Sequence, residues 1–184
     1  MPNPATSVTS TPTTATPTTA APAAPAVPAA RAEIRIREIA PGELPVVHAI
    51  RREVFIVEQG VPEEDEWDDL DGGCVHLLAE DADGSPLGTA RLIHGDQAYN
   101  LTGRDDVVLL GRLAVRLGAR GTGLGAALVR AIERAGVERG ARELELHAQV
   151  DAIGFYQRLG YAAHGPEYLD GGIPHRTMTR VLTS

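Results

Sequence analysis

Seven short segments carry alternating or continuous apolar positions between turn residues, a pattern that predicts strands. They are residues 33–39, 74–80, 87–94, 107–115, 143–149, 161–167 and 175–182. Apolar residues at helical spacing predict two longer helices, one through Val47, Ile50, Val54 and Val57 and one from Leu124 to about Gly140. A shorter helix is predicted over residues 151–160. This order of strands and helices predicts a single mixed α/β sheet.

The first residues differ sharply in composition from the rest. Residues 1–30 consist mainly of Pro, Thr, Ala and Ser and carry no Asp, Glu, Lys or Arg. Such a segment has too few large apolar groups to offset the entropy of ordering, so we expect a disordered leader over residues 1–31. It lacks the basic start and the continuous apolar run of a secretory signal. The remaining residues, 32–184, are enough for one domain.

Charge and cysteine content narrow the classes of function. The formal net charge of −8 argues against nucleic acid as a general partner. No segment is long and apolar enough to cross a bilayer, which argues against a membrane protein. Cys74 is the only cysteine, so no disulfide can form within the chain and a cytoplasmic location is expected. The histidines show no metal-ligand spacing, and we expect no metal.

The most informative stretch is a strand that runs into a glycine-rich turn and then a helix. Residues 110–115 precede the turn Arg120-Gly121-Thr122-Gly123-Leu124-Gly125. Backbone N–H groups and a helix dipole converge at such a turn, which is typical of a phosphate site. Gly121 to Ala126 also fits the G-x-G-x-x-G/A dinucleotide fingerprint, with Glu143 placed to hold a ribose. A dinucleotide fold needs several more βα units than the about sixty residues that follow.

Three elements together resemble the GNAT superfamily of N-acetyltransferases. Arg120-x-x-Gly123-x-Gly125 is similar to the pyrophosphate loop of that family. Residues 151–161, DAIGFYQRLGY, look like its A-x-x-F-Y-x-x-x-G-F/Y signature. Residues 54–59 and 172–175 further resemble the ElaA-type branch, and the likeness covers about residues 34–182. It implies an acyl-CoA N-acyltransferase fold, with a mixed sheet of six to seven strands and about four helices.

The resemblance also implies a reaction and a co-substrate. Acetyl-CoA would pass its acetyl group directly to a primary amine of a small molecule or an exposed protein amine, through a tetrahedral intermediate. The residues expected to hold acetyl-CoA are Leu113, Ala114, Val115, Arg120, Gly121, Thr122, Gly123, Leu124, Gly125, Ala126, Asp151 and Phe155. Tyr156 matches the tyrosine that protonates the leaving thiolate in many members, a role that suits a phenol. A ring packed in the core is the alternative.

The general base is less narrowly defined. An alkylammonium must lose a proton before it attacks, and His175, Glu58, His76 and His147 are candidates to accept it. His175 is preferred for a substrate contact, and His76 and Gln149 are further candidates. Arg91 and Arg112 each interrupt an apolar strand: they either orient a carboxylate-bearing acceptor or pair with acids inside the domain. The acidic run of residues 63–71 is either a solvated loop or a rim that attracts amines.

Two other functions stay open on the sequence alone. A non-catalytic acyl-CoA-binding sensor would keep the loop from Arg120 to Gly125 but tolerate loss of Tyr156. A dinucleotide-dependent oxidoreductase would use the glycine fingerprint but disagrees with the order of elements. An exposed edge strand near the C-terminus allows either a monomer or a homodimer.

Overall fold

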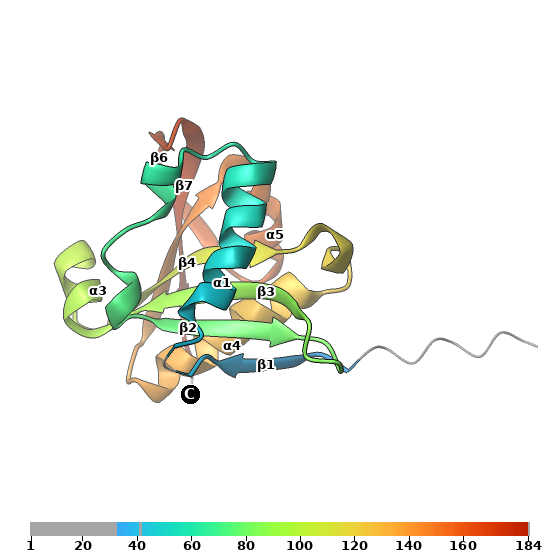
Figure 1. Ribbon diagram of the computed structural model, residues 1–184. Helices are drawn as coiled ribbons and strands as arrows, with labels where there is room; N and C mark the ends of the chain where they lie inside the picture. The colour runs from blue at the N-terminus through green and yellow to red at the C-terminus, as the bar shows by residue number, and fades with distance from the viewer. Residues whose placement is uncertain (1–32, 41, 184) are drawn as a thin grey trace, which may run out of the picture. The chain divides into compact units, whose positions relative to one another are not determined.

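The computed structural model describes residues 33–40 and 42–183, and its centre is one mixed sheet. Within these residues seven strands lie in the order β1-β2-β3-β4-β5-β7-β6 (Figure 1). The strands are β1 (Arg35–Glu38), β2 (Val75–Glu80), β3 (Pro86–Ile93), β4 (Val107–Val115), β5 (Glu143–Gln149), β6 (Ala162–Asp170) and β7 (Ile173–Val181). The seven-stranded mixed sheet confirms the predicted fold class. The predicted leader, residues 1–31, lies outside the described residues, so the domain boundaries stay a prediction.

Helices connect and cover these strands. The α-helices are α1 (Leu44–Arg51), α2 (Glu63–Glu66), α3 (Gly95–Thr102), α4 (Leu124–Glu138) and α5 (Ile153–Arg158). A π-helical segment, η1 (Arg52–Glu58), extends α1, and short 3₁₀ turns are η2 (Asp71–Gly73), η3 (Leu117–Ala119) and η4 (Val150–Ala152). In the described part of the chain there are thus five α-helices where about four were expected. No helix there is long and apolar enough to cross a membrane.

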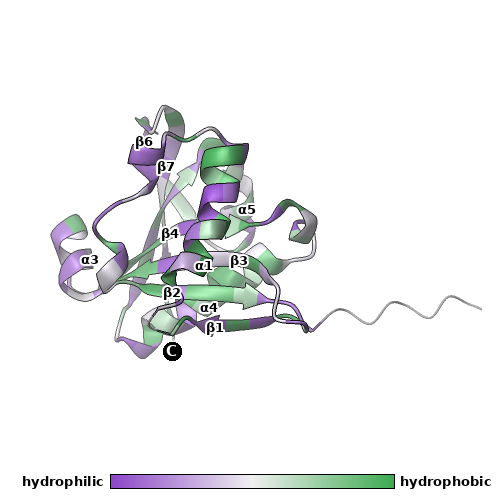
Figure 2. Cartoon of the chain, in the orientation of Figure 1, coloured by the Kyte–Doolittle hydropathy of each residue, from purple (hydrophilic) through white to green (hydrophobic). Residues whose placement is uncertain are grey.

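The sheet is covered on both faces because its strands bury alternate residues on opposite sides. Leu77 packs in the cluster with α4, whereas its neighbour Leu78 packs with Val47 and Ile50 of α1. Figure 1 shows α1 in front of the strands and α4 behind them, and Figure 2 shows the hydrophobic residues concentrated in the strands between. The two helices therefore fix the central strands from both sides.

One prediction for the first helix is wrong. Val47, Ile50 and Val54 are buried as expected, but Val57 is 75% exposed. The backbone N–H of Gln59 donates to the carbonyl of Val54, five residues earlier, at 3.2 Å. This wider turn holds more residues than an α-helical turn, so the apolar stripe leaves the buried face before Val57.

Helix α3 was not predicted. Its sequence offers few apolar residues at helical spacing, and only Ala98 is buried, while Tyr99 and Leu101 are half exposed. The helix ends at Gly103, whose φ of 69° is the left-handed conformation that terminates many helices. Its existence depends on contact with β4 more than on its own pattern.

Candidate active site

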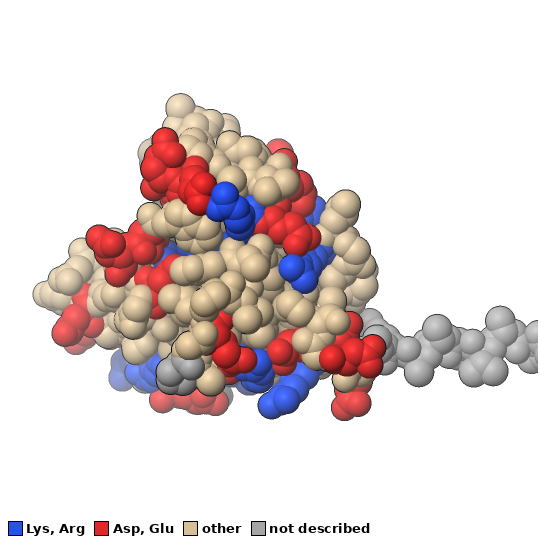
Figure 3. Space-filling model, in the orientation of Figure 1, with Lys and Arg blue, Asp and Glu red and all other residues tan. Residues whose placement is uncertain are grey.

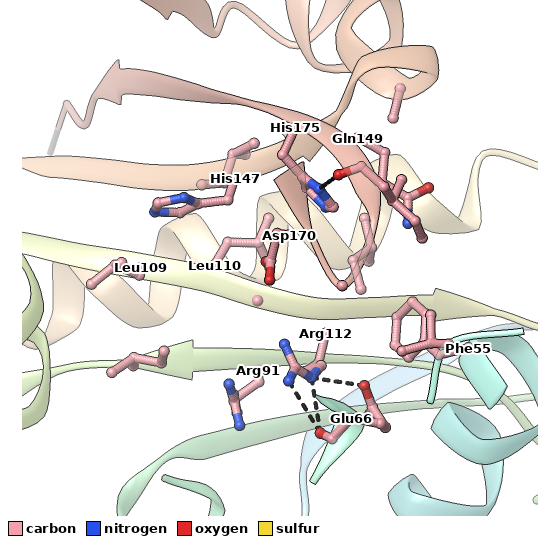
Figure 4. A pocket seen from close by; sticks show the side chains of 18 of the residues that line it. Phe55, Glu66, Arg91, Leu109, Leu110, Arg112, His147, Gln149, Asp170 and His175 are labelled. Atoms are coloured by element: carbon pink, nitrogen blue, oxygen red, sulfur yellow. Dashed lines mark hydrogen bonds and ion pairs between the residues drawn. The ribbon is translucent and has the colours of Figure 1, made fainter. Parts of the chain in front are cut away.

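The two parallel strands of the sheet separate at one end. Strands β4 and β5 pair from Val107↔Glu143 to Leu110↔Leu146, and no further, although both strands continue. A cavity of about 630 Å³ opens where they diverge. Eight of the predicted site residues line it: Arg91, Arg112, Leu113, His147, Gln149, Phe155, Tyr156 and His175. Figure 4 shows His147 and His175 on one side of the cavity and Arg91 and Arg112 on the other.

A bulge in β4 shapes the floor of this cavity. Arg91 of β3 pairs with Gly111, but Thr89 pairs with Ala114, so β4 holds one residue more than its partner strand between these pairs. Arg112 lies in the bulge with a φ of 52°, the one positive φ outside glycine among the described residues. Beyond it, Ala114 and Val115 pair with β3, and none of Leu113, Ala114 and Val115 pairs with β5.

The glycine turn supplies unpaired N–H groups at the start of α4. Gly123 caps this 15-residue helix with a φ of 91°, and Gly121 has a φ of 75°, values that side chains with a Cβ rarely adopt. The first N–H groups of any helix lack partners within it, so those of Leu124, Gly125 and Ala126 are directed towards the turn. A Cβ on Gly125 would lie 3.5 Å from the ring of Phe155. Backbone donors and a positive helix end thus meet beside the cavity.

Arg120 is already engaged at the edge of this turn. Its Nη1 and Nη2 donate to the two carboxylate oxygens of Glu58 at 2.6 and 2.7 Å, and its Nε donates to the carbonyl of Val115 at 2.8 Å. The hydrogen bonds from Arg120 lower the pKa of Glu58. Next to this pair, Gln149 Nε2 donates to Gln59 at 3.1 Å. The end of η1 therefore contacts both sides of the gap between β4 and β5.

Tyr156 combines burial with access to the cavity. It is 9% exposed, and its ring packs edge-on against Phe155 and Tyr161 with centroids 4.9 and 5.9 Å away. Burial raises the pKa of Tyr156 to about 12, so the phenol holds its proton at neutral pH. The residue is thus both a member of the core and part of the cavity wall.

His175 is held with one ring nitrogen available. Its Nδ1 lies 2.8 Å from the carbonyl oxygen of Ile173, and because a carbonyl can only accept, Nδ1 carries the hydrogen. The lone pair of the neutral ring is then on Nε2. His175 also stacks on Tyr168, whose hydroxyl bonds to His147. The ring is therefore fixed in orientation and tautomer.

Three arginines and three carboxylates form a closed alternating circuit beside the cavity, here called the ion ring. Its members in order are Arg51, Glu66, Arg112, Asp68, Arg91 and Asp71, joined by N–O distances of 2.5, 2.9, 3.4, 2.6, 2.7 and 2.7 Å. Arg51 is fully buried and Arg91 is 2% exposed. Burial alone would raise the pKa of Asp71, but its bonds with Arg91 and Arg51 hold that pKa well below the usual range. The ring ties the loop of residues 63–71 to β3 and β4.

Comparison with known proteins decides the family. The protein-family model described as acetyltransferase (GNAT) domain matches residues 47–182 of this sequence. This chain belongs to the GNAT acetyltransferase family.

The relatives are similar over most of their length. A putative acetyltransferase of Bacillus subtilis is 38% identical over 141 residues, which are 75% of this chain and 89% of the relative. The crystal structure of an acyl-CoA N-acyltransferase from Pseudomonas aeruginosa is 32% identical, with a TM-score of 0.67 and coverage of 82% of this chain and 99% of that one. Escherichia coli ElaA is 26% identical, with a TM-score of 0.68 and coverage of 80% and 99%. Membership in the GNAT family supports acyl transfer from acyl-CoA and excludes the dinucleotide fold.

Three of the predicted site residues, His76, Glu58 and Asp151, lie outside the cavity lining. His76 does not line the cavity: it is 4% exposed, its Nε2 donates to the carbonyl of Asp71 at 3.0 Å, and burial lowers its pKa. Glu58 lies at the rim, paired with Arg120, instead of at the cavity wall. Asp151 is exposed and also outside the lining.

The two strand arginines pair with acids inside the domain, which was the second of the two interpretations given for them. Arg91 and Arg112 face the cavity but bind Asp68, Asp71 and Glu66 of the loop. These three acids of the run 63–71 therefore point inward to the ion ring and do not form a free acidic rim.

Sequence reasoning missed part of the cavity wall. Phe55, Asp65, Glu145 and Asp170 line it as well. Glu145 was within reach of the pattern, because it lies two residues before His147 and so shares the same face of β5. Asp65 lies in α2, within the acidic run already considered as a rim, and Asp170 is the last residue of β6; their place in the cavity depends on tertiary packing, which the sequence does not define.

Proposed function

We propose that this protein is an N-acetyltransferase that transfers an acetyl group from acetyl-CoA directly to a primary amine. The observation that carries the proposal is the gap between β4 and β5, with backbone groups left unpaired on one side and the start of α4 at its end. Tyr156 and His175 both line the cavity in this gap.

The residues around the gap fit acetyl-CoA. The backbone of Leu113 to Val115 has no strand partner on the β5 side, and the groups there that Arg120 does not bind can form strand-like hydrogen bonds to an extended amide-bearing arm. The glycine turn from Gly121 to Ala126 offers N–H donors to a pyrophosphate, with the helix dipole behind them. Arg120 adds a positive charge at the same edge. Bound acetyl-CoA supplies an activated thioester, and the chain itself supplies binding, orientation and proton transfer.

Tyr156 and His175 carry the two proton transfers in this proposal. The neutral Nε2 of His175 accepts a proton from the acceptor ammonium, which frees the nitrogen lone pair for attack. Tyr156 keeps its own proton at neutral pH and donates it to the sulfur that leaves. Glu58 is a poor base because its bonds with Arg120 lower its pKa.

The test is release of the free CoA thiol in the presence of primary amines, compared between the native protein and two tyrosine variants. Tyr156→Phe should lower kcat by about 10²- to 10⁴-fold with acetyl-CoA affinity retained, the size of a lost acid. Tyr161→Phe is the matched control, since that buried hydroxyl donates to Glu133 at 3.0 Å and does not line the cavity.

Three outcomes would contradict the proposal. Equal turnover in Tyr156→Phe removes the acid. A covalent acetyl-protein that turns over, detected by intact mass, removes direct transfer. Acetyl-CoA binding without transfer to any amine favours the sensor.

A further inference from the structure

The acceptor side of the cavity carries negative charge that no arginine neutralises. Asp65, Glu145 and Asp170 line it; Glu145 lies 3.4 Å from His147 Nε2, and no ion pair joins any of the three to an arginine within the described residues. The Asp65 carboxylate lies 3.8 Å from the place a Cβ on Gly171 would take, so it borders the hairpin that holds Asp170. Figure 4 shows the Asp170 carboxylate directed into the cavity between the histidines and β4. Figure 3 shows the same excess of acidic side chains on the outer face of this part of the molecule.

The arginines at this cavity are occupied by the ion ring. Arg91 Nη1 and Nη2 donate to Asp68 and Asp71, and Arg112 contacts Glu66 and Asp68. Three positive and three negative groups balance within the ring. Among the described residues, an acceptor with its own carboxylate would meet cavity arginines that are already paired with acids of the ring, and it would be repelled by Asp65, Glu145 and Asp170.

One buried donor remains without a partner. Arg91 is 2% exposed and lines the cavity, yet its Nε has no hydrogen-bond acceptor within the described chain. Nε lies 3.9 Å from the position of a Cβ on Gly111, at the cavity floor. Buried N–H groups are nearly always satisfied, so this donor calls for an oxygen acceptor, supplied by a bound water or by a bound molecule.

The reaction itself separates the roles of these charges. The nitrogen that attacks must be neutral, so the reacting amino group cannot neutralise the nearby carboxylates at that step. A second positive charge on the acceptor would neutralise them. We infer that the acceptor is a dicationic amine without a carboxylate: one amino group reacts beside His175 while a second ammonium is held by Asp170 and Asp65. This inference rests on the proposed function and gives it a substrate class.

The test compares three classes of acceptor with saturating acetyl-CoA. Linear α,ω-diamines from three to six carbons are matched by length with n-alkylamines and with ω-amino acids, and thiol release is measured for each. At the best length, kcat/KM per amino group should be about tenfold higher for the diamine than for the alkylamine, as two carboxylate contacts allow. The ω-amino acid should be the poorest of the three.

Variants test which carboxylate binds the second ammonium of the diamine. Asp170→Asn should raise KM for the diamine and bring its kcat/KM close to that of the alkylamine. Asp69→Asn is the control, because Asp69 is an exposed acid of the run 63–71 that does not line the cavity. Added salt should reduce the diamine preference in the native protein.

The outcomes separate this inference from the proposed function. Equal kcat/KM for diamines and alkylamines at every length, or a preference for ω-amino acids, overturns the inference while acetyl transfer stands. A diamine preference that survives in Asp170→Asn and Asp65→Asn overturns the binding site assigned to the second ammonium. Thiol release with none of the acceptors overturns both.

Discussion

Glu66→Gln tests the ion ring with almost no change of shape. Glu66 is 3% exposed; its carboxylate accepts from Arg51 Nε at 2.5 Å and forms an ion pair with Arg112, whose Nε lies 2.9 Å away. The substitution removes one negative charge and leaves the fully buried Arg51 with Asp71 as its remaining acidic partner. Loss of one partner from a buried ion pair costs about 3–5 kcal/mol, and we expect the lower end because the amide oxygen can still accept.

The assay is urea denaturation at neutral pH, followed by circular dichroism. A loss of about 3 kcal/mol should lower the urea midpoint with an unchanged denaturant slope. In thermal unfolding, the same loss corresponds to a fall of roughly 6–12 °C in Tm for a domain of this size. Glu63→Gln is the matched control, because Glu63 belongs to the same helix and pairs with Arg52, but both side chains are about half exposed. Equal unfolding midpoints for Glu66→Gln and the native protein would refute the structural role of the ring.

Three further predictions concern the same elements. Gly88→Ala places a Cβ 2.9 Å from the carbonyl oxygen of Ala114 and should cost about 1–3 kcal/mol of stability. In Gly111→Ala the new Cβ lies 3.8 Å from Arg91, so the urea midpoint should change less. A larger loss in Gly111→Ala than in Gly88→Ala would contradict the packing at the bulge. Glu58→Gln removes the carboxylate that binds Arg120 and so frees that guanidinium, which should tighten acetyl-CoA binding a few-fold in calorimetry. Glu53→Gln is the control and should leave the binding unchanged. Weaker binding in Glu58→Gln would mean that Glu58 positions Arg120 for the ligand. Arg91 and Arg51 keep the pKa of Asp71 low, so its contribution to stability is complete above the unfolded pKa of about 3.9 and is lost as pH falls towards the folded value. Unfolding free energy should therefore drop below about pH 4, and Asp71→Asn should flatten that slope; an identical slope in this variant would contradict the assignment.

The order of elements could be predicted because each element leaves a local pattern. The strands over residues 107–115 and 143–149 match β4 and β5 at both ends. The glycine turn after Arg120 defined the start of α4, since glycine at a positive φ and an apolar stripe from Leu124 occur side by side. Periodicity and turn chemistry act within a few residues of each other, which is why they can be read from one sequence.

Contacts between distant residues could not be predicted in the same way. The ion ring joins Arg91 and Arg112 to acids 20 to 46 residues away, and these pairs depend on the register of β3 against β4 and on the bulge at Arg112. The π-helical turn that exposes Val57 likewise has no local signal. The exposed helix α3 was missed because its pattern is weak and its contacts are tertiary.

Calorimetric titration of the protein with acetyl-CoA, and separately with NADH and NADPH, tests the central claim most directly. We predict one acetyl-CoA bound per chain, with weaker binding in Arg120→Ala and no change in Arg104→Ala, an exposed arginine paired with Glu143. Neither dinucleotide should bind. Binding of NADH or NADPH in place of acetyl-CoA would contradict the function proposed for the gap between β4 and β5.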